Sequence, residues 1–186
     1  MKGTQAMRIL AIIIVLVVSV SAYGDQTTNN PVEVGDVRWG RDFDAALKKS
    51  AAEGKPVLVL FQEIPGCSGV RKFGREVLTN PLLVQAMEDE FIPMLVYNNR
   101  SSGMDRELME RYQEPSWNFQ VIRFLDAEGR DVIPRKDRVW TASGVAERMI
   151  EALLAVNRTV PDYLKNITGT ELGQNEGDMK RPFLSP

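Results

Sequence analysis

The chain has 186 residues, of which 44% are hydrophobic and 26% charged, and this is enough for one domain with a sizeable core. Its 23 basic and 25 acidic residues give a formal net charge of −2, so the sequence predicts no nucleic-acid partner. The lack of histidine excludes Ser-His-Asp and Cys-His catalysis and His-ligated metals. A single cysteine excludes an intrachain disulfide and a cysteine-cluster metal site. We therefore expect no metal, and we assign no cofactor.

The first residues carry the pattern of an export signal. Two basic residues precede a continuous apolar run over 9–20, and small residues follow it. Cleavage after Ala22 or Gly24 fits the small-residue rule, so residues 1–24 are predicted to be a signal peptide and the protein to be periplasmic or secreted. The run is shorter than the roughly 20 residues that a spanning helix needs. The alternative is an uncleaved signal anchor that tethers the protein to a membrane.

The remaining chain is predicted to hold a polar linker over 25–36, one domain over 37–164 and a flexible, polar tail over 165–186. Within the domain, apolar periodicity, turn residues and caps predict the following elements in chain order: a helix over 42–53, a strand over 57–62, a helix from Cys67 to Leu78, a short helix from Pro81, a strand over 91–97, a short helix over 104–112, a strand over 121–125, a returning antiparallel strand over 130–133, and a helix over 143–157 capped by Ser143.

This order predicts an α/β fold with a mixed central sheet and helices on both faces. The strand over 57–62 begins with five consecutive apolar residues, Val57 to Phe61. Such a run is typical of a central strand that is buried on both faces.

The stretch from Lys55 to Phe73 holds the candidate site. The apolar strand is followed by a Pro-Gly turn that ends at Gly66, and Cys67 then stands where a helix should begin. Unpaired N–H groups and the helix dipole favour negative charge at such a position, so a thiolate there would be stabilised. Ser68 flanks the thiol, and Glu63 could accept its proton. The alternatives are a buried, inert Cys67 and a Glu63 that is only a solvated carboxylate.

The strand–turn–Cys–helix layout resembles the active-site region of the thioredoxin superfamily. Two further segments, DFDAALKKSAAEGKPVLVLF and VIRFLDAEGRDV, look like the family's helix–strand entry and its strand–turn–strand hairpin. The resemblance covers 37–164 and implies a thioredoxin-like fold. It also implies that Cys67 matches the attacking cysteine and that Val70 stands in the place of the resolving one. The family's cis-proline position falls near Gln120, and Pro115 is the nearest alternative.

Two classes of function follow from this resemblance. In the first, Cys67 exchanges disulfides with client protein thiols or disulfides, or traps them, as a monothiol thiol-disulfide oxidoreductase. In the second, the fold is catalytically inactive and binds a partner protein or peptide, with Trp117, Phe119 and Ile64 as candidate contacts. Cys67 of two copies could also join in a disulfide-linked homodimer.

Overall fold

The computed structural model describes residues 29–116 and 120–169. The named elements within these residues are η1 (Val32–Val34), α1 (Phe43–Glu53), β1 (Val57–Gln62), α2 (Ser68–Glu76), α3 (Pro81–Glu90), β2 (Ile92–Tyr97), α4 (Gly103–Arg111), β3 (Val121–Leu125) and α5 (Ala142–Ala155). The predicted order of helices and strands is therefore confirmed, apart from the returning strand after β3.

The sheet has the strand order β2-β1-β3, so β1 lies in the middle. β1 runs parallel to β2, with Val57 opposite Ile92, and antiparallel to β3, with Val57 opposite Leu125. Gly40 forms a parallel bridge with Met94 at the outer edge of β2. Its N–H donates to the carbonyl of Pro93, and its carbonyl accepts from the N–H of Leu95. The result is the mixed sheet that the sequence predicts.

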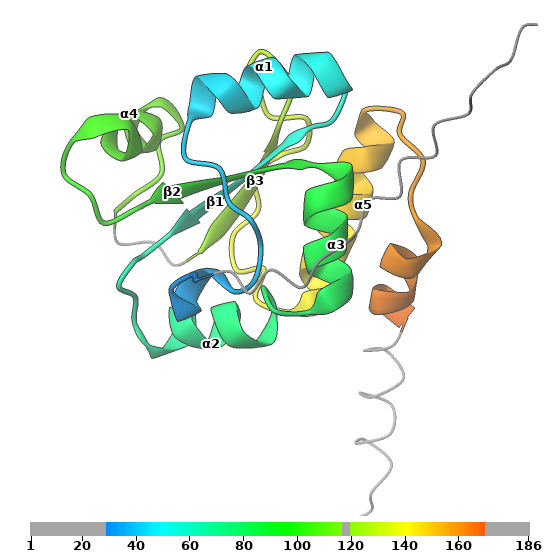
Figure 1. The fold of residues 1–186 in the computed structure, drawn as a ribbon, viewed down its shortest axis with the longest axis horizontal. Helices are drawn as coiled ribbons and strands as arrows, with labels where there is room; N and C mark the ends of the chain where they lie inside the picture. Colours follow the sequence, from blue (N-terminus) through cyan, green and yellow to red (C-terminus); the bar gives the residue numbers. More distant parts are fainter. Residues whose placement is uncertain (1–28, 117–119, 170–186) are drawn as a thin grey trace, which may run out of the picture.

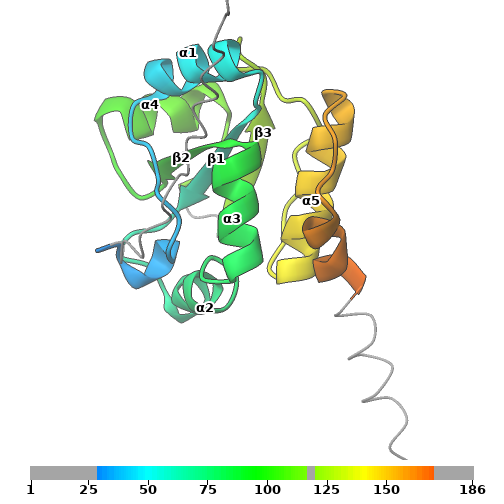
Figure 2. The same cartoon turned by 45° about the vertical axis from the view of Figure 1, so that its right-hand side comes forward.

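Helices cover both faces of this sheet. Alternate residues of β1 point to opposite sides, because successive side chains of a strand alternate. Leu58 and Leu60 join one apolar cluster with α2, α3 and α5, whereas Val57, Val59 and Phe61 join another with α1 and α4. Figure 1 shows the two helical layers on either side of the sheet, and Figure 2 shows α3 beside α5. The predicted α/β architecture, a mixed central sheet with helices on both faces, is thus confirmed.

The folded domain extends beyond the predicted range of 37–164 at both ends. The predicted linker includes η1, in which Val34 is 1% exposed, and α2 lies so close to it that a Cβ on Gly74 would stand 2.0 Å from the carbonyl oxygen of Val32. At the other end, residues 162–169 are helical and lie beside α5, with Ile167 6% exposed in the core (Figures 1 and 2). Buried apolar side chains make both segments part of the domain. The predicted signal peptide and residues 170–186 lie outside the described residues.

Two local predictions are wrong. The returning strand over 130–133 is a single antiparallel bridge between Leu125 and Asp131, because Pro134 has no N–H with which to continue a ladder. The last helix is capped by Thr141, whose hydroxyl accepts the N–H of Gly144 at 3.1 Å, rather than by Ser143. Within residues 29–116 and 120–169, no helix has both the length and the apolar character needed to cross a membrane.

A buried ionic network fastens β3 to the loops on either side of it. The carboxylate of Glu114, whose side chain is 1% exposed, accepts from Arg123 Nε and from Arg135 Nε at 2.7 Å each. Arg123, on β3, also contacts Asp131 at 2.6 Å. The hydrogen bond to Glu114 is the main reason that the pKa of Arg135 is raised. Glu114 therefore holds two guanidinium groups that come from separate segments.

Replacing Glu114 with alanine should lower the free energy of unfolding by about 3 kcal/mol, because it removes a buried carboxylate that pairs with both Arg123 and Arg135. The variant leaves Asp131 as the carboxylate partner of Arg123. Urea denaturation followed by circular dichroism measures this loss. The matched control is Glu110→Ala, which removes an exposed pair with Arg106 on α4 and should change stability little. Equal stabilities of the two variants would contradict the assignment.

Candidate functional site

Cys67 stands at the junction between the central strand and helix α2. It is the N-cap residue of α2 and is exposed. Its Sγ lies over the first helical turn, 3.9 Å from the place that a Cβ on Gly69 would take. The Cys67 side chain makes no capping hydrogen bond at this helix end. The alternative of a buried cysteine is therefore wrong, and Cys67 stands at a helix end whose first N–H groups lack intrahelical partners.

Two carboxylates accept consecutive backbone N–H groups at the end of this turn. Glu63 Oε2 accepts from Cys67 N at 3.3 Å, and Glu33 Oε1 accepts from Gly66 N at 3.2 Å. The side chain of Asn99 contacts both the N–H and the carbonyl of Ile64, at 3.5 and 3.2 Å. The loop between β1 and α2 is thus held by its own Glu63 and by side chains from two other parts of the chain, Glu33 and Asn99.

Close packing explains why residue 66 is a glycine. It also fixes the side chain of Val70, which stands in the place of the family's resolving cysteine. A Cβ on Gly66 would come within 2.6 Å of both the carbonyl oxygen of Glu63 and Cγ1 of Val70. Val70 is fully buried, whereas Cys67, Ser68 and Gly69 are exposed. Of the residues predicted for the site, Cys67, Gly66 and Glu63 therefore lie together. Ser68 is their exposed neighbour at the first helical position.

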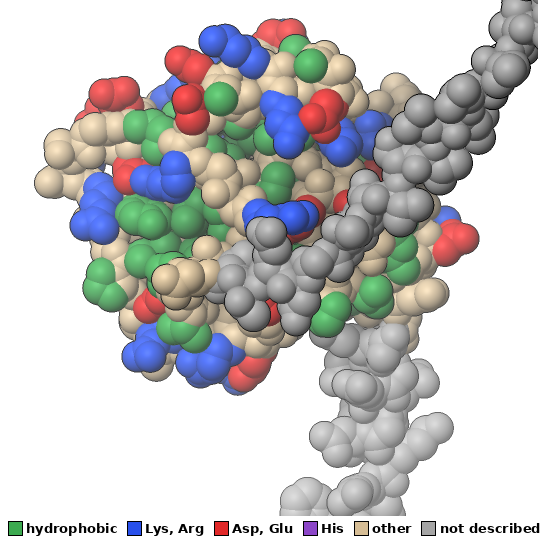
Figure 3. Space-filling view, in the orientation of Figure 1, with side chains coloured by type: hydrophobic (Ala, Val, Ile, Leu, Met, Phe, Trp, Pro, Cys, Tyr) green, Lys and Arg blue, Asp and Glu red, His purple; other side chains and the backbone are tan. Residues whose placement is uncertain are grey.

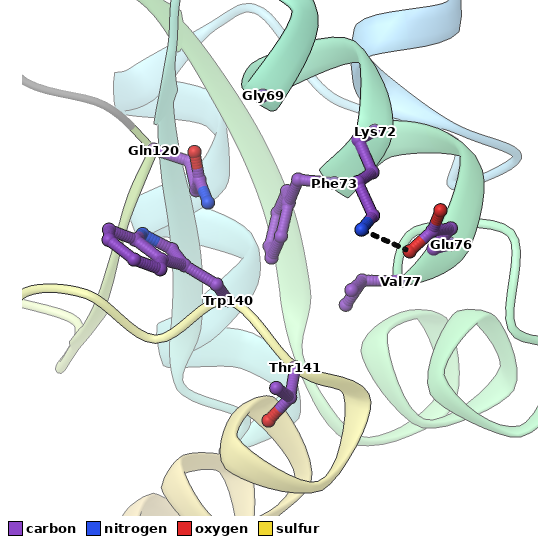
Figure 4. A pocket seen from close by; sticks show the side chains of 8 residues that line it. All are labelled: Gly69, Lys72, Phe73, Glu76, Val77, Gln120, Trp140 and Thr141. Carbon is purple, nitrogen blue, oxygen red and sulfur yellow. Dashed lines mark ion pairs between the residues drawn. The ribbon is translucent and has the colours of Figure 1, made fainter.

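A pocket of about 420 Å³ opens beside the thiol-bearing turn. Its lining residues come from α2, from the start of β3 and from the segment before α5: Gly69, Lys72, Phe73, Glu76, Val77, Gln120, Trp140 and Thr141. Figure 4 shows Trp140 and Gln120 on one side and Phe73 on the other, with Lys72 and Glu76 paired at the rim. Trp140 is 49% exposed, so an apolar ring is open to a ligand next to the helix that carries Cys67.

Neither Gln120 nor Pro115, the two positions compared with the family's cis-proline, is a cis-proline. Gln120 is buried and its side chain faces the pocket (Figure 4). Within the described residues, the cis peptide bond joins Ile64 and Pro65, and the bond before Pro115 is trans. Of the three predicted aromatic and apolar contacts, Ile64 is 7% exposed and belongs to the core. Trp117 and Phe119 lie outside the described residues.

Charge and metal-ligating groups are dispersed over the surface. Basic and acidic side chains are intermixed on the face in Figure 3, in keeping with the small net charge of −2. The described part of the chain contains no group of three or more side chains that could hold a metal ion.

Comparison with known proteins gives the fold of the chain. Residues 38–127 match a family model described as thioredoxin-like. Among solved structures, the chain is similar to a DsbH oxidoreductase, with 20% sequence identity and a TM-score of 0.53, over 72% of this chain and 96% of that one. A comparison with curated proteins found no match. The family-model match and the structural likeness together show that the chain has a thioredoxin-like fold.

Sequence reasoning missed two residues of this site. Glu33 lies in the predicted linker, and only the folding of η1 against α2 brings its carboxylate to Gly66. Trp140 lies in a segment without periodicity, so no local pattern distinguishes it from a core residue. The backbone N–H of Asp36 donates to the carbonyl oxygen of Leu78 and so joins the segment after η1 to the segment after α2. No local sequence pattern predicts this contact either.

The variant Val70→Cys should form an intramolecular disulfide with Cys67. Two residues three positions apart at a helix start have Cα atoms at about the 5–6 Å that a disulfide requires, and cysteine is close to valine in size. After mild oxidation, mass spectrometry with and without a reductant should show that alkylation is blocked until the bond is reduced. Val70→Ala, which has no second thiol, should stay open to alkylation. Two free thiols in oxidised, folded Val70→Cys would contradict this geometry.

Proposed function

We propose that this protein exchanges thiols and disulfides through Cys67 alone, as an exported monothiol protein with a thioredoxin-like fold. The observation that carries the proposal is the exposed sulfur at the start of α2, at the end of the buried strand β1. The similar solved structure is an oxidoreductase, which supports the same class of chemistry. The substrate class is client protein disulfides and thiols.

In the proposed reaction the Cys67 thiolate attacks one sulfur of a client disulfide. A new S–S bond joins Cys67 to the client, the old S–S bond breaks, and the second client sulfur leaves as a thiolate. The chain has one cysteine, so a second thiolate must come from outside it. The client's own freed thiolate or a low-molecular-weight thiol attacks the mixed disulfide and releases Cys67. Until that attack, the client remains covalently held.

The carboxylate of Glu63 supports this reaction through the loop. Its contact is with the backbone N–H of Cys67, which fixes the start of α2. This contact favours a role in holding the turn over a role in accepting the thiol's proton. The pocket next to α2 would receive an apolar side chain of the client, because Trp140 and Phe73 line it.

The second candidate function is binding without catalysis, and the same pocket favours it. An exposed tryptophan beside buried apolar groups is a feature of protein interaction sites. In this case the partner is a peptide or an unfolded segment with an apolar side chain, and Cys67 is dispensable. A third candidate is a disulfide-linked homodimer through the exposed Cys67, which depends on the thiol chemistry of the first candidate and not on the pocket.

Incubation with glutathione disulfide should add one glutathione to the protein, and Cys67→Ala should remain unmodified. An added low-molecular-weight thiol should remove the group, because the mixed disulfide has no internal thiol to resolve it. Intact mass spectrometry measures each state, and a non-reducing gel detects a band at twice the chain mass if two copies pair. An unmodified wild-type protein would contradict thiol exchange.

A labelled, reduced and alkylated unfolded polypeptide separates the second function from the first. If binding is the function, Cys67→Ala retains the affinity measured by fluorescence anisotropy, while Trp140→Ala weakens it. If exchange is the function, this probe, which has no free thiol or disulfide, binds only weakly to all three proteins.

Export is part of the proposal and rests on residues 1–24, which lie outside the described residues. The mature chain should begin at Tyr23 or Asp25, after cleavage at one of the two small-residue sites. Intact mass and N-terminal sequencing of protein from the extracytoplasmic fraction measure this directly. A full-length chain that sediments with membranes would instead support an uncleaved anchor.

A further inference from the structure

A buried carboxylate lies under the loop that carries Cys67. Glu33, from η1, is 6% exposed, and its Oε1 accepts the N–H of Gly66 at 3.2 Å. The same oxygen lies 4.0 Å from Nε of Arg71, whose side chain is 54% exposed on the first turns of α2. The carboxylate therefore touches the residue before Cys67 and faces a cation that follows it.

Glu33 is held in place by contacts on both sides of its backbone. Its carbonyl oxygen accepts from Nε2 of Gln62, the fully buried last residue of β1, at 2.6 Å. On the other side, its backbone packs against α2 at Gly74, where a Cβ would stand 2.8 Å from Cα of Glu33. Since neither the strand nor the helix leaves room for η1 to shift, the position of the carboxylate is fixed relative to the loop.

We infer that Glu33 is a positioning residue for the reaction of Cys67, an inference that rests on the proposed thiol chemistry. It acts in two ways. It fixes the Gly66 N–H, and so the direction in which the chain enters Cys67 and α2. It also pairs with Arg71, and this ion pair holds the guanidinium near the buried carboxylate beneath the loop. The Glu33 carboxylate contacts Gly66 and Arg71, so its effect on the sulfur passes through the backbone, through Arg71 and through its own charge.

The sign of the effect follows from the charges around the thiol. Glu33 and Glu63 place negative charge at the loop, and α2 contributes Arg71 and then Lys72. A negative charge opposes formation of a nearby thiolate and a positive charge favours it. Glu33→Gln keeps an oxygen that can accept the Gly66 N–H, but it removes one negative charge and frees Arg71. This variant should make Cys67 react faster.

The test is the second-order rate of Cys67 alkylation by iodoacetamide, in which carbon–sulfur bond formation releases iodide. The rate is measured across the pH range in which thiols ionise, at low and high salt. At neutral pH and low salt, Glu33→Gln should react about three-fold faster or more, the size of effect that one nearby charge has in a well-solvated setting. Its rate–pH profile should move toward lower pH, and added salt should reduce the difference.

Two further variants keep the result interpretable. Arg71→Gln should react more slowly than wild type, and the effect of Glu33→Gln should shrink in the Arg71→Gln background if Glu33 acts partly through Arg71. Glu107→Gln, an exposed carboxylate on α4 across the sheet, is the control and should leave the rate unchanged. Circular dichroism and thermal unfolding confirm that each variant is folded.

The failures of the two proposals are distinguishable. If wild-type Cys67 does not react in the folded protein, the proposed function fails and this role fails with it. If Cys67 reacts but Glu33→Gln has the wild-type rate and pH profile, only the positioning role is overturned. A slower Glu33→Gln with an unchanged profile would likewise overturn it, because this variant keeps an acceptor for the Gly66 N–H and removes a negative charge, and so should react faster.

Discussion

The central strand β1 has almost no contact with solvent, since each of its six residues is at most 1% exposed. Its hydrogen bonds are taken up by β2 on one edge and β3 on the other, and each of its faces is covered by helices. Because both edges and both faces of β1 are covered, the chain after β1 can continue only from the end of the strand. The loop after Gln62 emerges at the end where α2 packs, and Cys67 follows within five residues. The place of the sulfur is thus a consequence of the burial of β1.

The glycine–valine contact at Gly66 and Val70 gives the site its chemical character. Val70 points into the interior and fills the space against Gly66, so the loop is packed without a second sulfur. A thiol exchanger built in this way forms covalent adducts that other molecules must resolve. The pocket beside α2 then matters more than in a two-cysteine enzyme, because it would decide which clients stay close to the sulfur long enough to react.

Much of the fold could be predicted from the sequence because its signals are local. The run Val57–Phe61, the Asp42 cap and the turn ending at Gly66 each depend on neighbouring residues, and all three are confirmed. Contacts between distant segments have no such signal. Glu33 lies in the predicted linker, so its contact with Gly66 was not predicted. Glu114 likewise forms its network with side chains from β3 and from the segment after it. The exposed Cys67 was one of two open alternatives, and tertiary packing decided between them.

The entry turn η1 is at once the first folded segment of the domain and the floor of the loop that bears the sulfur. In Figure 1 it lies directly against α2, so the described chain begins on the side of the molecule that holds the turn with Cys67. Under the proposed thiol chemistry, a substitution in this short turn would reach the sulfur-bearing loop without passing through the sheet, because Glu33 contacts Gly66 directly.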